Sequence, residues 1–285
     1  MNVTISGSSG FIGSAISRAL KTKGWQVKKI NRASLLISTD LFLKEFIEGA
    51  DVIINLAGAP VQKRWTTSYK KEIVSSRVET TLKIADAMNK AEKKTSLMIS
   101  ESAVVIYDSF HHHDEESSSL GEDFLAEVCR KWEDAARRTE KQTRLVVLRI
   151  GVVLGKEGGM LKKVAPLFRI GLGGKIGNGA QMMSWIHLSD LLRMVNFLIE
   201  HPAIEGVVNA VSPEPVSNQV FTQALGKVLG QPTFFTVPPL ALKLMVGETA
   251  GMMLSGQTVI PQKLLENGFE FEFPSIGKAL KDIYH

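Results

Sequence analysis

A glycine-rich turn close to the N-terminus constrains the fold of this chain more than any other feature. The apolar run Val3 to Ser6 is typical of a buried strand, and Gly7-Ser8-Ser9-Gly10-Phe11-Ile12-Gly13 follows it directly. Apolar residues then recur at the spacing of one helix face, at Ile12, Ala15, Ile16, Ala19 and Leu20. Strand, glycine turn and amphipathic helix in this order predict a dinucleotide-binding turn of the Rossmann type.

Each part of the turn has a physical role in such a site. The first glycine permits the tight turn, the second lets the backbone approach a pyrophosphate, and the third lets helix and strand pack closely. The free N–H groups at the helix N-terminus attract that anion. We therefore predict cofactor contacts from Gly7, Ser9, Gly10, Phe11, Ile12 and Gly13. The alternative is a glycine-rich turn that binds no ligand.

The end of the second predicted strand, Trp25 to Ile30, indicates which dinucleotide binds. Sites for NAD usually place an acidic residue about twenty residues after the glycines, where it binds the ribose 2′-hydroxyl. This chain has Asn31-Arg32 there. An arginine forms a charge-assisted, bidentate pair with a 2′-phosphate, and no acidic side chain competes for it. The sequence therefore favours NADP(H); the alternative for Arg32 is a solvated surface arginine.

Strand and helix signals alternate through the first half of the chain, which is typical of an α/β protein with a doubly wound parallel sheet. We expect further strands over Ser34 to Ser38, Val52 to Asn55, Leu97 to Ser100 and Leu145 to Arg149. We expect helices over Leu41 to Glu48, Thr67 to Lys90 and Phe124 to Arg138, the last with Asp123 as N-cap.

The pattern changes after residue 155. Glycines are frequent between residues 156 and 180, so we expect much of this segment to be loop. A strand over Met183 to His187 and a helix from Ser189 to about Glu200 follow, and beyond Asn209 prolines separate shorter elements. We predict an NADP-binding domain of residues 1–155 and 181–210, and a smaller substrate domain of residues 156–180 and 211–285.

Composition excludes several classes of function. The net charge is +5, but the basic residues are scattered and no reading motif accompanies them, which argues against nucleic-acid binding and suits a small anionic ligand. The single cysteine forbids an internal disulfide and fits a reducing compartment. No run is long enough for a membrane span, and no secretory signal is evident. We expect a cytoplasmic protein with a small-molecule substrate; the sequence gives no oligomeric state.

Several motifs together resemble one known family. They are Gly7 to Gly13, Asn55 to Gly58, Ser100 to Tyr107, Leu148-Arg149 and Trp185 to Asp190, which resemble the extended short-chain dehydrogenase/reductases of the nucleotide-sugar epimerase type. A more specific resemblance is to an atypical branch called epimerase family proteins. Its marks are Arg64-Trp65-Thr66, Ser76-Arg77-Val78, Asp123 to Cys129, Gly151 to Gly155 and Phe168 to Gly174. The resemblance extends over nearly the whole chain.

This resemblance implies NADP bound between a doubly wound sheet and a C-terminal substrate domain. Carried over by position, it implies further cofactor contacts from Leu56, Ala57, Gly58, Glu72, Arg77 and Val153. Arg77 can neutralise the pyrophosphate or orient a ribose. The alternative for Glu72 and Arg77 is an ordinary surface ion pair, which contributes about 0–1 kcal/mol.

The catalytic pair of the superfamily is absent. Ordinary members use a tyrosine four residues before a lysine, and the lysine lowers the pKa of the tyrosine. None of the tyrosines, Tyr69, Tyr107 and Tyr284, precedes a lysine at that spacing, and the expected helix has Leu125 and Cys129 there. Ser102 matches the superfamily serine, and Tyr107 is the candidate for a substitute acid, although no lysine is placed to activate it. Glu101 stands where the branch usually has a small residue. The alternative for Ser102 and Tyr107 is simple packing.

Two hypotheses of function follow. The first is an NADP(H)-dependent oxidoreductase or epimerase-like enzyme, in which Ser102 polarises a carbonyl and the proton comes from Tyr107, water or the substrate. The second is an NADP(H)-binding sensor or scaffold that has lost catalysis. His111-His112-His113 does not predict a metal site, because adjacent loop residues do not share one face; a solvated polar loop is the better interpretation. Cys129 is expected to be a core residue.

Overall fold

A parallel sheet forms the centre of the molecule in the computed structural model, which describes residues 1–31, 40–139 and 143–285. Within these residues its strand order is β2-β1-β3-β4-β6-β11, and every neighbouring pair is parallel. The strands are β1 (Asn2–Ser6), β2 (Gln26–Ile30), β3 (Val52–Asn55), β4 (Leu97–Ala103), β6 (Arg144–Ile150) and β11 (Gly206–Ala210). This confirms the predicted α/β, doubly wound parallel sheet.

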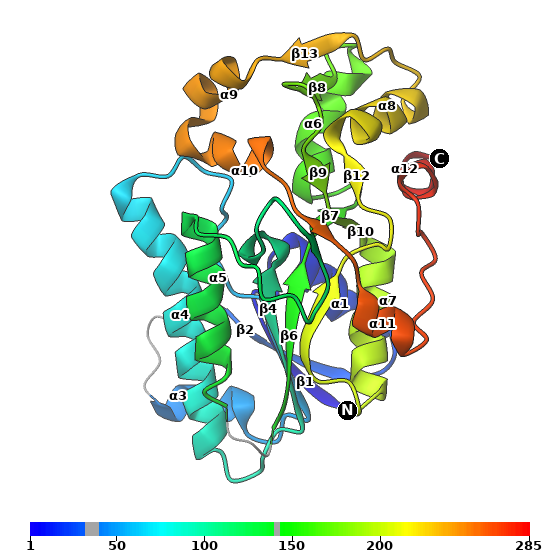
Figure 1. The fold of residues 1–285 in the computed structure, drawn as a ribbon. Coiled ribbons are helices and arrows are strands. Elements are labelled where there is room, and N and C mark those ends of the chain that lie inside the picture. Colours follow the sequence, from blue (N-terminus) through cyan, green and yellow to red (C-terminus); the bar gives the residue numbers. More distant parts are fainter. Residues whose placement is uncertain (32–39, 140–142) are drawn as a thin grey trace.

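Helices cover both faces of the sheet, as the unbroken apolar run of β3 requires (Figure 1). On one face, Ile16 of α1 (Phe11–Thr22) and Leu191 of α7 (Leu188–Glu200) share a core with Leu97 and Ile99 of β4. On the other face, Met98 of β4 packs in a second core with residues of α3 and α4. The helices on that side are α3 (Asp40–Ile47), α4 (Thr67–Lys90) and α5 (Phe124–Ala136).

A smaller lobe lies beyond the carboxyl ends of the strands, in the upper part of Figure 1. Its core brings Leu161 and Phe168 together with Phe221, Ile276 and Leu280. Its helices are α6 (Gly159–Arg169), α8 (Asn218–Val228), α9 (Pro239–Val246), α10 (Ala250–Leu254) and α12 (Ile276–Tyr284). Its short strands are β8 (Gly174–Ile176), β9 (Met182–Met183), β12 (Val216–Ser217) and β13 (Phe235–Val237).

Two further strands join the lobe to the sheet region. β7 (Val152–Leu154) follows β6 and pairs in parallel with β10 (Trp185–His187), which leads into α7. The chain therefore leaves the sheet region at residue 155 and has returned to it by residue 185, close to the predicted domain boundaries. Those boundaries themselves stay a prediction.

Most predicted elements agree with the structure. The helix over Thr67 to Lys90 has the predicted bounds, and Asp123 caps α5 by accepting a hydrogen bond from the Ala126 N–H. The loop expected between residues 156 and 180 is wrong in part, since α6 is a helix of 11 residues. It contains Pro166, and two glycines, Gly158 and Gly159, form its N-cap and first residue, so its local signals resembled those of a loop. The predicted strand Ser34 to Ser38 lies outside the described residues.

Candidate functional site

The glycine turn brings the ends of β1 and β3 close to the start of α1. Gly7 has a φ of 72°, and a Cβ at this position would overlap the carbonyl oxygen of Leu56. A Cβ at Gly13 would overlap the carbonyl oxygen of Gly7. The N–H of Gly10 donates to that same oxygen at 3.1 Å. A side chain is therefore excluded at the first and third glycines by the protein itself.

The second glycine is different, because space remains around it. Gly10 is exposed, and a Cβ there would meet only the Gly7 oxygen, at 3.3 Å. Gly10 is the N-cap of α1, and no side chain caps the helix. Among the residues that the structure describes, the first N–H groups of α1 therefore lack a side-chain cap, and they carry the positive end of the helix dipole. The residues present fit a dinucleotide pyrophosphate at this place.

The other predicted residues of the turn have separate surroundings. Ser9 is exposed, and Ile12 packs on the core between the sheet, α1 and α7. The Phe11 ring occupies the space that a Cβ would take at Gly155 and Gly158, in the loop between β7 and α6. Val153 is 8% exposed and belongs to the sheet core. Asn31 follows β2 and is exposed, whereas Arg32 lies outside the described residues.

A buried chain of hydrogen bonds fixes the end of β3. The Ser6 hydroxyl donates to Asn55 Oδ1 at 2.6 Å, and Asn55 Nδ2 donates to Thr81 of α4 at 2.7 Å. The Trp132 indole of α5 also donates to Thr81, at 2.9 Å. Sequence reasoning missed Asn55 as a positioning residue. Its signal was a polar side chain at the end of an apolar strand, directly before Leu56-Ala57-Gly58.

Arg77 of α4 reaches the same edge of the sheet. Its guanidinium donates to the carbonyl oxygens of Ala59 at 3.0 Å and Ile73 at 3.2 Å, and lies over the Trp132 ring. A Cβ at Gly58 would lie 2.8 Å from the Arg77 Cζ atom. Burial lowers the pKa of Arg77 from its usual value, partly offset by the charge of Glu101. The structure therefore brings Arg77 to Leu56–Gly58, as the resemblance implied; Glu72 is half-buried on the same helix.

Ser102 lies in a buried ionic network on the α5 face of β4. Its hydroxyl donates to Glu133 Oε1 at 2.8 Å, and Arg149 of β6 donates to both Glu133 oxygens at 2.8 and 2.9 Å. Arg137 also reaches Glu133, at 3.0 Å. The Ser102 hydroxyl is thus part of a network in which the carboxylate is fully engaged.

Tyr107 joins this network from the other side. The Arg149 guanidinium lies over its ring, and its hydroxyl lies 2.9 Å from the Asp114 carbonyl and 3.0 Å from Asn209 Oδ1. The side chain is 1% exposed, and burial raises the pKa of its hydroxyl. The structure therefore brings Ser102 and Tyr107 together through Arg149, inside the protein.

The two helix positions at which the superfamily has its catalytic pair are buried in apolar surroundings here. Leu125 is 6% and Cys129 4% exposed. Burial raises the pKa of the Cys129 thiol to about 12, so it is a neutral core residue at physiological pH, as predicted.

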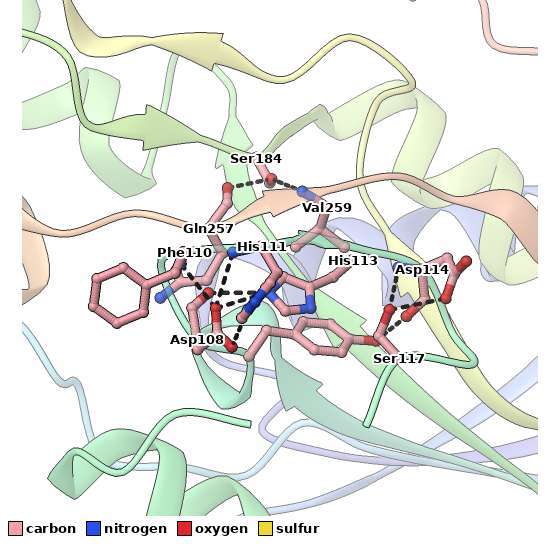
Figure 2. A network of polar contacts seen from close by, with 10 residues as sticks. Asp108, Phe110, His111, His113, Asp114, Ser117, Ser184, Gln257 and Val259 are labelled. Carbon is pink, nitrogen blue, oxygen red and sulfur yellow. Dashed lines mark hydrogen bonds and ion pairs between the residues drawn. The ribbon is translucent and has the colours of Figure 1, made fainter. Parts of the chain in front are cut away.

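The histidine segment is not the solvated loop that we expected. His112–His113 form strand β5, which pairs in parallel with β14 (Thr258–Val259), and His113 stacks on Tyr107. Figure 2 shows Asp108 in polar contact with both His111 and His113, and Ser184 bonded to Gln257, which precedes β14, and to Val259 within β14. His113 is 2% exposed, so the prediction is wrong for this residue. Its cover comes from a segment distant in sequence, which local composition does not indicate.

Glu101 faces the opposite side of β4 from Ser102. Side chains alternate along a strand, so Glu101 continues the row of Leu97 and Ile99, which pack toward α1 and α7. Its side chain is half-buried and forms no hydrogen bond within the described part of the chain. Burial raises the pKa of its carboxyl to about 7, although the charge of Arg77 opposes this. Sequence reasoning noted Glu101 only as an unusual residue.

Comparisons with known proteins agree with this geometry. Residues 3–210 match the NAD dependent epimerase/dehydratase family, and residues 237–283 match a domain of unknown function (DUF1731). Epimerase family protein SDR39U1 of Mus musculus is 37% identical over 99% of this chain and 99% of its own length. The chloroplastic SDR39U1 homolog of Arabidopsis thaliana is 36% identical over 99% of this chain and 86% of its length.

A solved structure is similar over its whole length. The crystal structure of human epimerase family protein SDR39U1 (isoform 2) with NADPH has a TM-score of 0.92 and 35% identity, covering 100% of this chain and 99% of that one. Within the described ranges, no helix of the present structure has the length and apolar character to cross a membrane.

Proposed function

Because the chain belongs to the NAD-dependent epimerase/dehydratase family, we propose that it binds NADP(H) at the carboxyl edge of its sheet. The observation that carries this proposal is the uncapped N-terminus of α1, approached by a turn in which Gly10 alone leaves space for a ligand. NADPH in the crystal structure of the human relative supports the same cofactor here.

Different residues of the chain would bind different parts of the cofactor. The N–H groups at the start of α1 would hold the pyrophosphate, next to Ser9 and Gly10. Asn31 and Arg32, after β2, would bind the adenosine ribose and its 2′-phosphate. Leu56 to Gly58 and Val153 would line the edge of the sheet, with Glu72 and Arg77 behind them. When bound, the cofactor supplies or accepts a hydride at its nicotinamide ring.

We further propose that this cofactor serves an oxidoreductase or epimerase-like reaction on a small carbonyl or alcohol. The C-terminal lobe would hold the substrate over the sheet edge. Two contacts support such an arrangement, since Thr249 donates to the Lys63 carbonyl at 3.0 Å and Glu248 pairs with Lys70. These contacts join the lobe to the segment between β3 and α4 and to the start of α4.

Ser102 and Tyr107 remain the residues that the superfamily resemblance nominates for this chemistry. For either hydroxyl to reach a substrate, its bond to Glu133 or to Asn209 and Asp114 must open. As they stand, both side chains support the edge of the sheet from within. Their positioning role is better supported than direct contact with a substrate.

The second candidate function is an NADP(H)-binding sensor or scaffold without catalysis. Its specific support is the apolar pair Leu125 and Cys129, together with the closed network around Ser102. Turnover of NADPH with any member of a broad carbonyl panel would exclude it. Tight binding of NADPH without oxidation across that panel would favour it.

Replacing Gly10 by alanine tests the cofactor site. Its backbone, at φ −72°, accepts alanine, and the added methyl meets only the Gly7 oxygen, so the fold should persist. The methyl would, however, occupy the approach to the helix N-terminus. We expect NADPH to bind the variant at least about tenfold more weakly, a loss of about 1.4 kcal/mol, in a fluorescence titration.

The matched control is Gly277→Ala in α12, where a Cβ meets no atom within 4 Å. It should bind NADPH as the wild type does. The same titration with NADH should give weaker binding to the wild type, since the 2′-phosphate is missing. Equal affinities of the Gly10→Ala and wild-type proteins, or a wild type that does not bind NADPH, would contradict the proposal.

A further inference from the structure

Bound as proposed above, the dinucleotide would lie along the carboxyl edge of the sheet, and its nicotinamide half would lie on the side of Glu101. β1, with the glycine turn, has β2 on one side and β3 then β4 on the other. The residues after β2 are those proposed above to bind the adenosine ribose, so the nicotinamide half would extend the other way, over β3 and β4. Glu101 lies one residue beyond Ser100, which pairs in register with Asn55 at the end of β3. Glu101 is therefore level with Leu56.

The surroundings of Glu101 are those of a group that exchanges protons rather than of a structural ion. Its carboxyl has no hydrogen bond within the described residues, and part of the side chain remains open to solvent. Arg77 of α4 is the charged group that acts on it. Residues 56–59 of the β3 loop and 11–14 of α1 bring no charged side chain, and Cys129 of α5 is neutral. With its pKa near 7, the carboxyl is divided between its acid and its carboxylate at neutral pH.

We propose that Glu101 is the proton carrier of this site, in place of the tyrosine of the superfamily's tyrosine–lysine pair, which the chain lacks. This inference rests on the proposed NADP(H)-dependent function. In the reducing direction, a carbonyl carbon receives a hydride, with its electron pair, from a reduced nicotinamide dinucleotide. The carbonyl π electrons move to oxygen, and the oxygen takes the proton of the Glu101 carboxyl. An alcohol and a Glu101 carboxylate result, and water returns a proton to the carboxylate.

This role has a consequence for binding that requires no substrate. The oxidised nicotinamide ring carries a positive charge that the reduced ring lacks. A Glu101 carboxylate next to the ring favours the oxidised form, whereas the neutral acid does not. The ratio Kd(NADPH)/Kd(NADP⁺) should therefore rise with pH as Glu101 ionises. The phosphates, which also titrate, are common to both ligands and cancel in the ratio.

The experiment measures both dissociation constants between pH 5.5 and 9, for the wild type and for Glu101→Gln. We expect the wild-type ratio to rise about tenfold with a midpoint near pH 7, because the carboxylate attracts the positive ring and the neutral acid does not. In Glu101→Gln the ratio should change less than about twofold over the same range. Glu79→Gln, an exposed position on α4, is the matched control and should behave like the wild type.

The outcomes separate the two proposals. If the wild type binds both ligands but its ratio is constant with pH, Glu101 is not the proton carrier, while the cofactor site stands. If Glu101→Gln keeps the wild-type rise, another group is responsible and the inference is equally overturned. If the wild type binds neither ligand, the proposed function itself fails. A wild-type ratio that stays constant with pH overturns the inference even if the variant does not fold.

Discussion

Glu101 and Ser102 are neighbours on β4, yet their polar groups lie in opposite surroundings. On the α5 face, Ser102 and Arg149 both bond to Glu133, and each of these three residues is 6% exposed or less. On the α1 face, Glu101 is half-buried and forms no hydrogen bond in the part of the chain that the structure describes. The difference teaches that the polar groups on the α5 face are engaged with one another, whereas the opposite face carries a carboxyl that no hydrogen bond occupies within the described residues.

Removing the Glu133 carboxylate should have the largest effect, because it breaks the network on which this comparison depends. Glu133→Ala leaves Arg149, 6% exposed, as a buried charge without its partner. We expect the free energy of unfolding to fall by about 3–5 kcal/mol, measured by urea denaturation at pH 7. Glu127→Ala, on the same helix but in an exposed pair with Lys131, is the control and should leave the urea midpoint nearly unchanged. Equal losses of unfolding free energy in the two variants would show that the buried network is no more important than an exposed ion pair.

Glu101→Gln should stabilise the protein in a pH-dependent way. The folded state raises the pKa of Glu101 from 4.5 to about 7, so ionisation costs stability as pH rises through this window. At pH 4 both states hold the proton, and the variant should match the wild type. At pH 8.5 it should be more stable by about 2 kcal/mol, less than the whole shift because solvent reaches the side chain. A stability difference that does not change with pH would show that Glu101 is not held neutral.

Tyr107→Phe should have the smallest effect and should be felt in stability alone. It removes the hydroxyl shared by the Asp114 carbonyl and Asn209, which we expect to cost about 1–2 kcal/mol in unfolding free energy. Because the hydroxyl points into the protein, the NADPH dissociation constant should change less than about twofold. Tyr69→Phe, whose exposed hydroxyl donates to the Pro60 carbonyl, should cost less stability. A large loss of NADPH affinity in Tyr107→Phe would place its hydroxyl at the cofactor instead.

The sheet and its main helices could be predicted because their signals are local. Thr66 and Asp123 cap α4 and α5 with their own side chains, and the apolar run of β3 requires burial on both faces. The helix α6 could not, since Gly158 and Gly159 at its start and Pro166 within it are also typical of a loop. The packing that selects the helix comes from Phe168 against α8 and α12, which the sequence does not reveal.

The part of the candidate site that the backbone forms could be predicted, whereas the face to which each side chain of β4 points could not. The glycine spacing indicated the turn, because only glycine fits at Gly7 and Gly13. That Ser102 faces α5 and Glu101 faces α1 follows from the register of β4, which a shift of one residue would reverse. The family resemblance therefore nominated Ser102 and noted Glu101 only as an unusual residue.

The covering of Tyr107 has a consequence for the order in which the protein can be completed during synthesis. β14 lies on β5, the Ile260 N–H donates to the His113 carbonyl, and Glu115 accepts from the Lys263 N–H. A nascent chain that has reached residue 250 has already made every strand of the central sheet, but not this cover. Until β14 emerges from the ribosome, the stacked rings of Tyr107 and His113 stay uncovered on that side. The burial of these residues in the N-terminal half therefore depends on the synthesis of the C-terminal segment.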